Sequence, residues 1–350
     1  ESVRRALVEH PNAKAVFVIN PTYYGVASNL KKIVEIAHSF GKPVIVDEAH
    51  GAHFGFHPDL PPSAMEAGAD ISAASVHKLI GSMTQSSILL VKSELVDDRK
   101  VKAAMNLTQT TSPSYPLMAS LDVARKQMAL HGREMLDKTI TLCERARKQM
   151  NQVRGIYVMG KEVEGTDACY RYDVTKFAIN VRELGLSGFE MEKILKYEYR
   201  IAVELSDLYN VLAVGAIGDN DGEAIDALVS AVEDIAKKYE RKNVIKITAP
   251  LPENQELVVS PRFAFYSPKR EVRLEDSEGE ISAEMLMAYP PGIPIICPGE
   301  RITSEVIEYA KALRAEGCHL QGTEDPEAQV IKVLADKNAV DFEQRQYQVI

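Results

Sequence analysis

An acid and a lysine stand where two neighbouring strands are expected to end. The apolar run Val44 to Val46 closes on Asp47, and a second strand, Ile71 to Ser75, is followed by Lys78. A lysine amine forms Schiff bases with carbonyl cofactors, and a carboxylate keeps a nearby pyridine nitrogen protonated. The pair therefore indicates chemistry on pyridoxal 5'-phosphate (PLP), with Lys78 as the Schiff-base lysine and Asp47 as the partner of the ring nitrogen.

Three further polar side chains accompany this pair. Ser75 and His77 precede the lysine in Ser-Val-His-Lys, where a hydroxyl and an imidazole are expected to hold the cofactor phosphate by hydrogen bonds. His50 lies three residues after Asp47, and we expect it to contact the cofactor ring or its substituents. A satisfied core histidine is the alternative interpretation of His77.

Two other interpretations of this region are weaker. The run Asp47 to His50 spells the DEAH box of helicases, but the chain lacks the phosphate loop that such enzymes need upstream. A zinc site built from Glu48, His50 and His53 would lack a well-spaced further ligand. No metal is therefore expected, and His53 and His57 are predicted at surface or turn positions.

The elements around these residues alternate between strand and helix. Ala15 to Ile19 reads as a strand buried on both faces. Leu30 to Ala37 shows helical spacing, with Ser28 or Asn29 as its cap and Gly41 as its end. This rhythm predicts an α/β fold with a mainly parallel sheet, in which functional groups sit beyond the carboxyl ends of the strands. We also predict a helix at Glu1 to His10 whose inward residues are Val3, Leu7 and Val8.

Later segments predict three domains. Residues 1–125 would be the remainder of a PLP-binding large domain, 126–240 a small α/β domain, and 241–350 a C-terminal domain. A helical stretch runs from about Ser114 to Gln152, and a polar, proline-bearing linker is expected near Lys242 to Glu256. The strands predicted in the small domain are Lys176 to Asn180, Ile201 to Glu204 and Val211 to Val214.

Composition narrows the function further. The net charge of −9 on 350 residues disfavours a nucleic-acid partner. No apolar run is long enough to span a membrane, and no signal peptide is apparent, so we expect a cytoplasmic protein. The four cysteines are widely spaced without a C-x-x-C pair, which predicts buried or inert thiols rather than a disulfide framework.

Five motifs occur in order over most of the chain: Asp47 to His53, Ser75 to Lys78 with Gln85 and Ser86, Thr110 to Tyr115, Glu204 to Tyr209, and Tyr289 to Glu300. Together they resemble the Orn/Lys/Arg decarboxylase family of fold-type-I PLP enzymes, and the last motif is particular to this family. The resemblance is strongest to its short bacterial branch of biosynthetic arginine decarboxylases.

The resemblance implies an activity and a partner. It implies a lyase of polyamine biosynthesis that decarboxylates a basic L-amino acid, with arginine favoured over lysine or ornithine on overall similarity. It also implies a homodimer or higher homo-oligomer with a shared active site, in which Thr110 or Ser112 reaches the phosphate of the neighbouring subunit. A capped turn before the long helix is the alternative for these two residues.

The resemblance also suggests where the substrate's distal cation would bind. The acids within the family motifs are Glu204, Asp207 and Glu300, and each is expected to face that cation or to be an ordinary surface charge. Glu300 follows Pro298-Gly299, so fixing a turn is a further alternative for it.

Family members carry an N-terminal segment that precedes the position of Glu1 and supplies a phosphate loop and a ring-stacking histidine. We expect this segment to be either lost or associated as a separate chain. Two other functions stay open: another fold-type-I enzyme, such as an aminotransferase or lyase, and a catalytically incomplete fragment or regulatory subunit.

Overall fold

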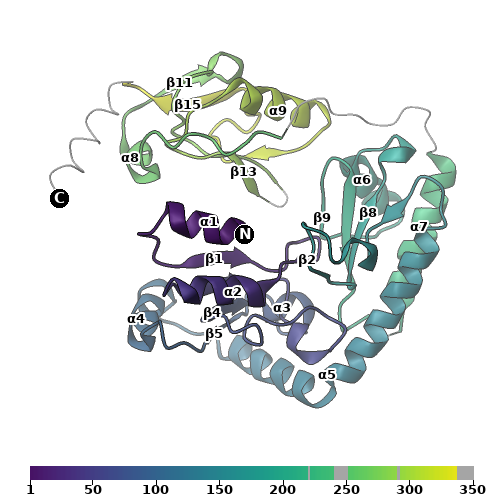
Figure 1. Ribbon diagram of the computed structural model, residues 1–350. Helices are drawn as coiled ribbons and strands as arrows, with labels where there is room; N and C mark the ends of the chain where they lie inside the picture. The colour runs from purple at the N-terminus through teal and green to yellow at the C-terminus, as the bar shows by residue number, and fades with distance from the viewer. Residues whose placement is uncertain (220, 240–250, 290–291, 337–350) are drawn as a thin grey trace. The chain divides into compact units, whose positions relative to one another are not determined.

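The computed structural model describes residues 1–219, 221–239, 251–289 and 292–336, which form two compact units (Figure 1). The first unit comprises Glu1–Asn180 and Leu212–Lys238. The second comprises Val181–Val211 and the described residues from Tyr239 onward.

The first unit is built on a four-stranded sheet in the order β1-β3-β4-β5. The first three strands pair in parallel, and β5 runs antiparallel to β4. The register sets Ile19 beside Asp47 and Asp47 beside Ala73, so β1, β3 and β4 end at one carboxyl edge. The predicted α/β class with a mainly parallel sheet is confirmed. The strands are β1 (Val16–Ile19), β3 (Val44–Asp47), β4 (Ile71–Ala74) and β5 (Ile88–Val91).

Helix α2 (Leu30–Ser39) packs on this sheet as its sequence pattern predicts. Its buried side chains include Leu30 and Val34, which join Val44 and Val46 of β3 in one apolar cluster. The side chain of Asn29 caps the helix by accepting a hydrogen bond from the backbone N–H of Lys32 at 3.1 Å. The packing of Leu30 and Val34 against Val44 and Val46 ties α2 to the strand that ends at Asp47.

Two predictions about apolar residues near the start of the chain are wrong. Phe17 and Ile19 of β1 are 64% and 56% exposed, so only one face of this strand is covered by described residues. In helix α1 (Ser2–Glu9), Leu7 is buried but Val8 is 64% exposed. Apolar residues favour burial, but the sequence of a strand or helix does not show whether a neighbouring element covers each of its faces.

The long helix α5 (Tyr115–Met150) matches the stretch predicted from about Ser114 to Gln152, and α7 (Glu223–Lys238) packs along it (Figure 1). The buried face of α5 includes Leu136 and Ile140. The other elements of the first unit are β2 (Val26–Ala27), the 3-10 helix η1 (Phe54–Phe56), α3 (Val76–Leu79), α4 (Asp98–Thr108), β6 (Tyr157–Val158), η2 (Lys161–Val163), β7 (Arg171–Tyr172), β8 (Lys176–Asn180) and most of β10 (Asn210–Val214).

The second unit has its own apolar core, in which Leu286, Ile296, Val306 and Val333 are fully buried. A capping box formed by Ser187 and Glu190 begins its helix α6. Its elements are η3 (Arg182–Leu184), α6 (Gly188–Glu198), β9 (Leu205–Ser206), α8 (Pro261–Tyr266), β11 (Lys269–Arg273), η4 (Leu274–Asp276), β12 (Leu286–Ala288), β13 (Ile293–Ile296), α9 (Ser304–Ala315), β14 (Leu320–Gln321) and β15 (Val330–Leu334).

The strand predicted at Ile201 to Glu204 is wrong. Arg200 adopts a positive φ of 59°, and the backbone N–H of Ile201 donates to the carbonyl of Leu195 at 2.9 Å, so this segment ends α6 and the strand begins only at Leu205. Most of the predicted linker and two prolines of the Tyr289 to Glu300 motif lie outside the described residues. Among the described helices, none combines the length and apolar character that crossing a bilayer requires.

Candidate active site

Lys78 and His50 meet at the carboxyl edge of the first unit's sheet. Lys78 lies in α3, which follows β4 directly, and His50 lies in the turn after β3. The Nζ of Lys78 is 2.9 Å from the Nε2 of His50. Because β3 and β4 are parallel neighbours, the segments that follow them emerge side by side, which is why residues 28 positions apart make contact.

Tyr23 completes this group from the loop that follows β1. Its ring centroid is 4.2 Å from that of His50, with the planes tilted by 50°, and the Nζ of Lys78 lies 5.3 Å from the Tyr23 centroid. Three successive parallel strands thus each deliver one side chain to the same place. Sequence reasoning missed Tyr23, although its position just beyond a predicted strand is the same signal that singled out Asp47.

His50 is held in its neutral form. Burial, followed by the cations of Lys176 and Lys78, lowers the pKa of His50 to about 3. A neutral ring accepts at Nε2 and carries its proton on Nδ1 when a lysine ammonium donates to it. The Nδ1 atom is buried and has no hydrogen-bond partner among the residues that the structure describes. A bound molecule beside Lys78 would supply such a partner.

Asp47 lies at the end of β3, half-buried. Its Oδ1 accepts a hydrogen bond from the backbone N–H of Ala49 at 3.0 Å, and its carbonyl accepts one from Asn20 at 2.9 Å. These bonds fix the turn that leads to His50. Asp47 therefore ends one strand and Lys78 follows its parallel neighbour, as predicted.

Ser75 and His77 flank the start of α3. Ser75 occupies the N-cap position without a side-chain capping bond. The Nδ1 of His77 is 2.7 Å from the carbonyl oxygen of Ser86. Because a carbonyl can only accept, Nδ1 carries the proton of a neutral ring, and Nε2 can donate to a phosphate only from the imidazolium form.

Thr110 and Ser112 lie just before α5 and are exposed. The backbone N–H of Ser112 donates to the Oγ1 of Thr110 at 3.2 Å, which forms a local turn. The turn interpretation thus has direct support, while their contact with a neighbouring subunit stays a prediction.

The three predicted substrate acids all belong to the second unit. Glu204 is exposed. The Oδ1 of Asp207 accepts hydrogen bonds from the backbone N–H groups of Tyr209 and Asn210. The Oε2 of Glu300 accepts one from the backbone of Cys297 at 2.7 Å, the turn-fixing arrangement. Their contact with a substrate stays a prediction.

The prediction that His53 and His57 occupy surface or turn positions is wrong in its surface part, since they are 1% and 7% exposed. The Nε2 of His53 is 3.1 Å from the Oδ2 of Asp173, and that of His57 is 2.8 Å from the Oδ1 of Asp137. Both carboxylates lie more than 75 residues further along the chain. Such distant partners leave no local signal in the sequence, and their bonds offset the cost of burying an imidazole.

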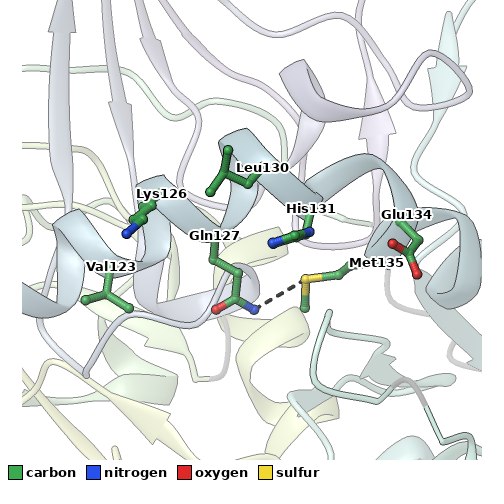
Figure 2. A pocket seen from close by; sticks show the side chains of 7 residues that line it. All are labelled: Val123, Lys126, Gln127, Leu130, His131, Glu134 and Met135. Atoms are coloured by element: carbon green, nitrogen blue, oxygen red, sulfur yellow. Dashed lines mark hydrogen bonds between the residues drawn. The ribbon is translucent and has the colours of Figure 1, made fainter.

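The arrangement at the carboxyl edge fits PLP. The sheet's carboxyl edge carries an amine (Lys78), an aromatic ring (Tyr23), a carboxylate (Asp47) and a buried imidazole (His50). The Nδ1 of that imidazole has no hydrogen-bond partner in the described part of the chain. A surface hollow elsewhere in the unit is lined by one face of α5 alone, where the Nε2 of Gln127 lies 3.3 Å from the sulfur of Met135 (Figure 2). None of the predicted site residues lines that hollow.

Two protein-family models match this chain, each over a different segment. Residues 1–223 match the major domain of Orn/Lys/Arg decarboxylases, and residues 251–336 match their C-terminal domain. The chain is 49% identical over 342 residues to an arginine decarboxylase of Bacillus subtilis, covering 97% of the chain and 70% of that relative. It is 46% identical over 338 residues to an arginine decarboxylase of Bacillus anthracis, covering 96% of the chain and 68% of that relative.

The fold also matches a solved structure. The constitutive lysine decarboxylase of Escherichia coli superposes with a TM-score of 0.76 at 21% identity, over 95% of this chain and 60% of that one. The chain thus spans less than two thirds of that enzyme's length, and the likeness confirms the fold-type-I architecture. The family models and the two Bacillus relatives show that the chain belongs to the Orn/Lys/Arg decarboxylase family.

Proposed function

We propose that the protein is a PLP-dependent carboxy-lyase that converts arginine to agmatine. The observation that carries the proposal is the convergence of Tyr23, His50 and Lys78 where three parallel strands end. The relatives at 46% to 49% identity named arginine decarboxylase favour arginine over lysine and ornithine.

The cofactor would be held by residues of the first unit. Lys78 would attach it covalently through Nζ, and Asp47 would lie against its ring nitrogen. Ser75 and His77 would bind its phosphate, with Thr110 or Ser112 contributed across a subunit contact. When bound, PLP supplies a protonated pyridine ring that accepts the electron pair released as the substrate's carboxylate leaves as CO2.

The chain's own groups divide the remaining work between orientation and proton transfer. His50 has a pKa near 3, so near neutral pH it accepts a hydrogen bond from Lys78 without taking its proton. It therefore fixes the position of Nζ beside the Tyr23 ring. The proton that replaces the carboxylate is accordingly held at Nζ of Lys78 rather than on His50.

One of the three acids predicted from the family motifs would bind the substrate's guanidinium. Glu204 is the leading candidate because its side chain is exposed, whereas Asp207 and Glu300 already accept hydrogen bonds from local backbone groups. A carboxylate binds a guanidinium through two parallel hydrogen bonds, which an ammonium cannot reproduce.

The proposal also covers the assembly, location and domain organisation of the protein. We propose that the protein works as a homodimer or higher homo-oligomer in the cytoplasm, in polyamine biosynthesis. We also retain the division into three domains at residues 125 and 240.

The test is a decarboxylation assay with arginine, lysine and ornithine, each labelled in the carboxylate, on the PLP-loaded protein. We expect labelled CO2 from arginine at a kcat/KM well above the other two, and no release from the Lys78→Ala variant. Lys138→Ala, which removes a surface lysine paired with Glu134, should retain activity. A preference for lysine or ornithine would contradict the substrate assignment, and release of a keto acid in place of CO2 would contradict the reaction.

A further inference from the structure

A buried cluster of charged groups lies in the first unit, outside the residues that the proposed reaction uses. It consists of His53, Asp173, Thr175 and Lys176, hereafter the Asp173 cluster. None of these residues is more than 1% exposed. The Oδ2 of Asp173 is 3.1 Å from the Nε2 of His53 and 3.9 Å from the Nζ of Lys176, and its Oδ1 accepts a hydrogen bond from the hydroxyl of Thr175 at 2.7 Å.

Asp173 remains ionised despite its burial. Burial alone would raise the pKa of Asp173, but the His53 ring and the Lys176 ammonium hold that pKa well below its usual range. A fully buried ion pair costs desolvation energy, and proteins often gain nothing in stability from it compared with apolar residues. Its presence here therefore calls for a role besides stability.

The cluster supports the loop that carries Tyr23. The backbone N–H of Asp173 donates to the carbonyl of Gly25 at 2.8 Å, and β2 pairs with β7 just beyond. Gly25 has a φ of +88°, and a Cβ built on it would lie 2.8 Å from the Cγ of Lys176. The stem of Lys176 thus packs directly against the backbone two residues after Tyr23.

The cluster also acts on His50. Burial is the largest cause of the lowered pKa of His50, and Lys176 is the next, ahead of Lys78. Asp173 acts in the opposite direction, and His53 lowers the pKa slightly. These charged groups act on the pKa of His50, and the ring of Tyr23 contacts the His50 ring directly.

We propose that Lys176, fixed in place by Asp173, is a positioning residue that keeps His50 a neutral acceptor for Lys78 and holds the Tyr23 loop against it. The buried cation of Lys176 disfavours protonation of His50, and its aliphatic stem packs against the Tyr23 loop. The inference rests on the proposed function only for its kinetic consequence, because the protonation of His50 can be measured without turnover.

The primary experiment titrates the histidines of the protein by NMR, with the His50 signal assigned by its loss in His50→Gln. In the unsubstituted protein we expect the His50 midpoint near pH 3. Lys176→Met removes the cation and keeps the stem, and we expect the His50 midpoint to rise by on the order of one pH unit. Lys138→Met, the same change at an exposed ion pair, should leave the midpoint unchanged.

A double variant keeps the test decisive if Lys176→Met alone fails to fold. Asp173→Asn combined with Lys176→Met removes both charges, so it leaves no uncompensated ion if the single variant fails to fold. Because Lys176 outweighs Asp173 at His50, the midpoint should still rise, by less than in the single variant. An unchanged or lower His50 midpoint in a folded variant would overturn the proposal. Failure of both variants to fold would also overturn it, in favour of a purely structural cluster.

The kinetic readout keeps the two hypotheses distinguishable. In the PLP-loaded protein, Lys176→Met should move the acid limb of the kcat/KM profile to higher pH, because His50 then takes up a proton and stops accepting from Lys78. If the protein shows no decarboxylation at all, the proposed function fails while the histidine titration still decides the role of Lys176. If activity is present and its acid limb does not move, the role of Lys176 fails alone.

Discussion

The Nζ of Lys78 lies 2.9 Å from the Nε2 of His50, in a pair formed by the turns that follow two adjacent parallel strands. The imidazole is neutral because burial and the nearby cations of Lys176 and Lys78 lower its pKa to about 3, so the contact orients the amine without removing its proton. The ring of Tyr23 lies against both groups.

Replacing His50 should therefore impair Lys78 without unfolding the protein. In His50→Gln the acceptor at Nε2 and the ring that contacts Tyr23 are both lost, and we expect kcat/KM to fall by about 10- to 100-fold and PLP to bind more weakly. Steady-state kinetics and a PLP titration followed by absorbance measure the two effects. His131→Gln changes an exposed histidine of α5 and should have neither effect; comparable losses in both variants would mean that the contact with Lys78 has no special role.

Glu48 predicts a specific pH dependence of stability. Its carboxylate is buried and accepts hydrogen bonds from the backbone of Ala64 and the hydroxyl of Ser72, and burial raises its pKa from 4.5 to about 7. The folded state thus binds more protons than the unfolded state between these values. The stability that Glu48 contributes is complete below pH 4.5 and is lost as the pH rises through 7.

The variant Glu48→Gln stays neutral and lacks this dependence. Relative to it, the unsubstituted protein should lose on the order of 3 kcal/mol of unfolding free energy between pH 4.5 and pH 8. Urea unfolding at several pH values measures the difference. A constant difference across this range would show that Glu48 is ionised in the folded protein throughout.

The loop that carries Tyr23 should tolerate no side chain at Gly25. An alanine there combines a positive φ with a Cβ 2.8 Å from Lys176, so Gly25→Ala should cost about 2–4 kcal/mol of unfolding free energy. Gly41→Ala is the matched control, because its φ is also positive at +66° but no atom lies within 4 Å of the added Cβ. That control should cost only about 1 kcal/mol. Equal losses in urea unfolding would show that backbone strain, and not the contact with Lys176, decides the effect.

The sequence allowed prediction of the elements whose signals are local. The strand ending at Asp47, the helix capped by Asn29 and the segment bearing Lys78 all follow from apolar spacing and turn residues, and the family motifs identified the same region. The contact between His50 and Lys78 follows from the parallel pairing of adjacent strands.

The rest depended on partners that are distant in the chain. His53 looked like a surface residue because its partner Asp173 follows it by more than a hundred positions. Phe17 and Ile19 looked buried because an apolar run does not show which face of a strand is covered. The roles of Ser75, Thr110 and Glu204, and the division into three domains, stay predictions.

The central claim is that Lys78 carries the cofactor, and borohydride reduction of the PLP-loaded protein tests it most directly. Reduction makes the linkage between PLP and its lysine permanent, so mass spectrometry of the digested protein locates it. We predict the pyridoxyl label on the peptide that contains Lys78, with none in Lys78→Ala and an unchanged label in Lys138→Ala. A label on another lysine, or an equal label in Lys78→Ala, would contradict the account.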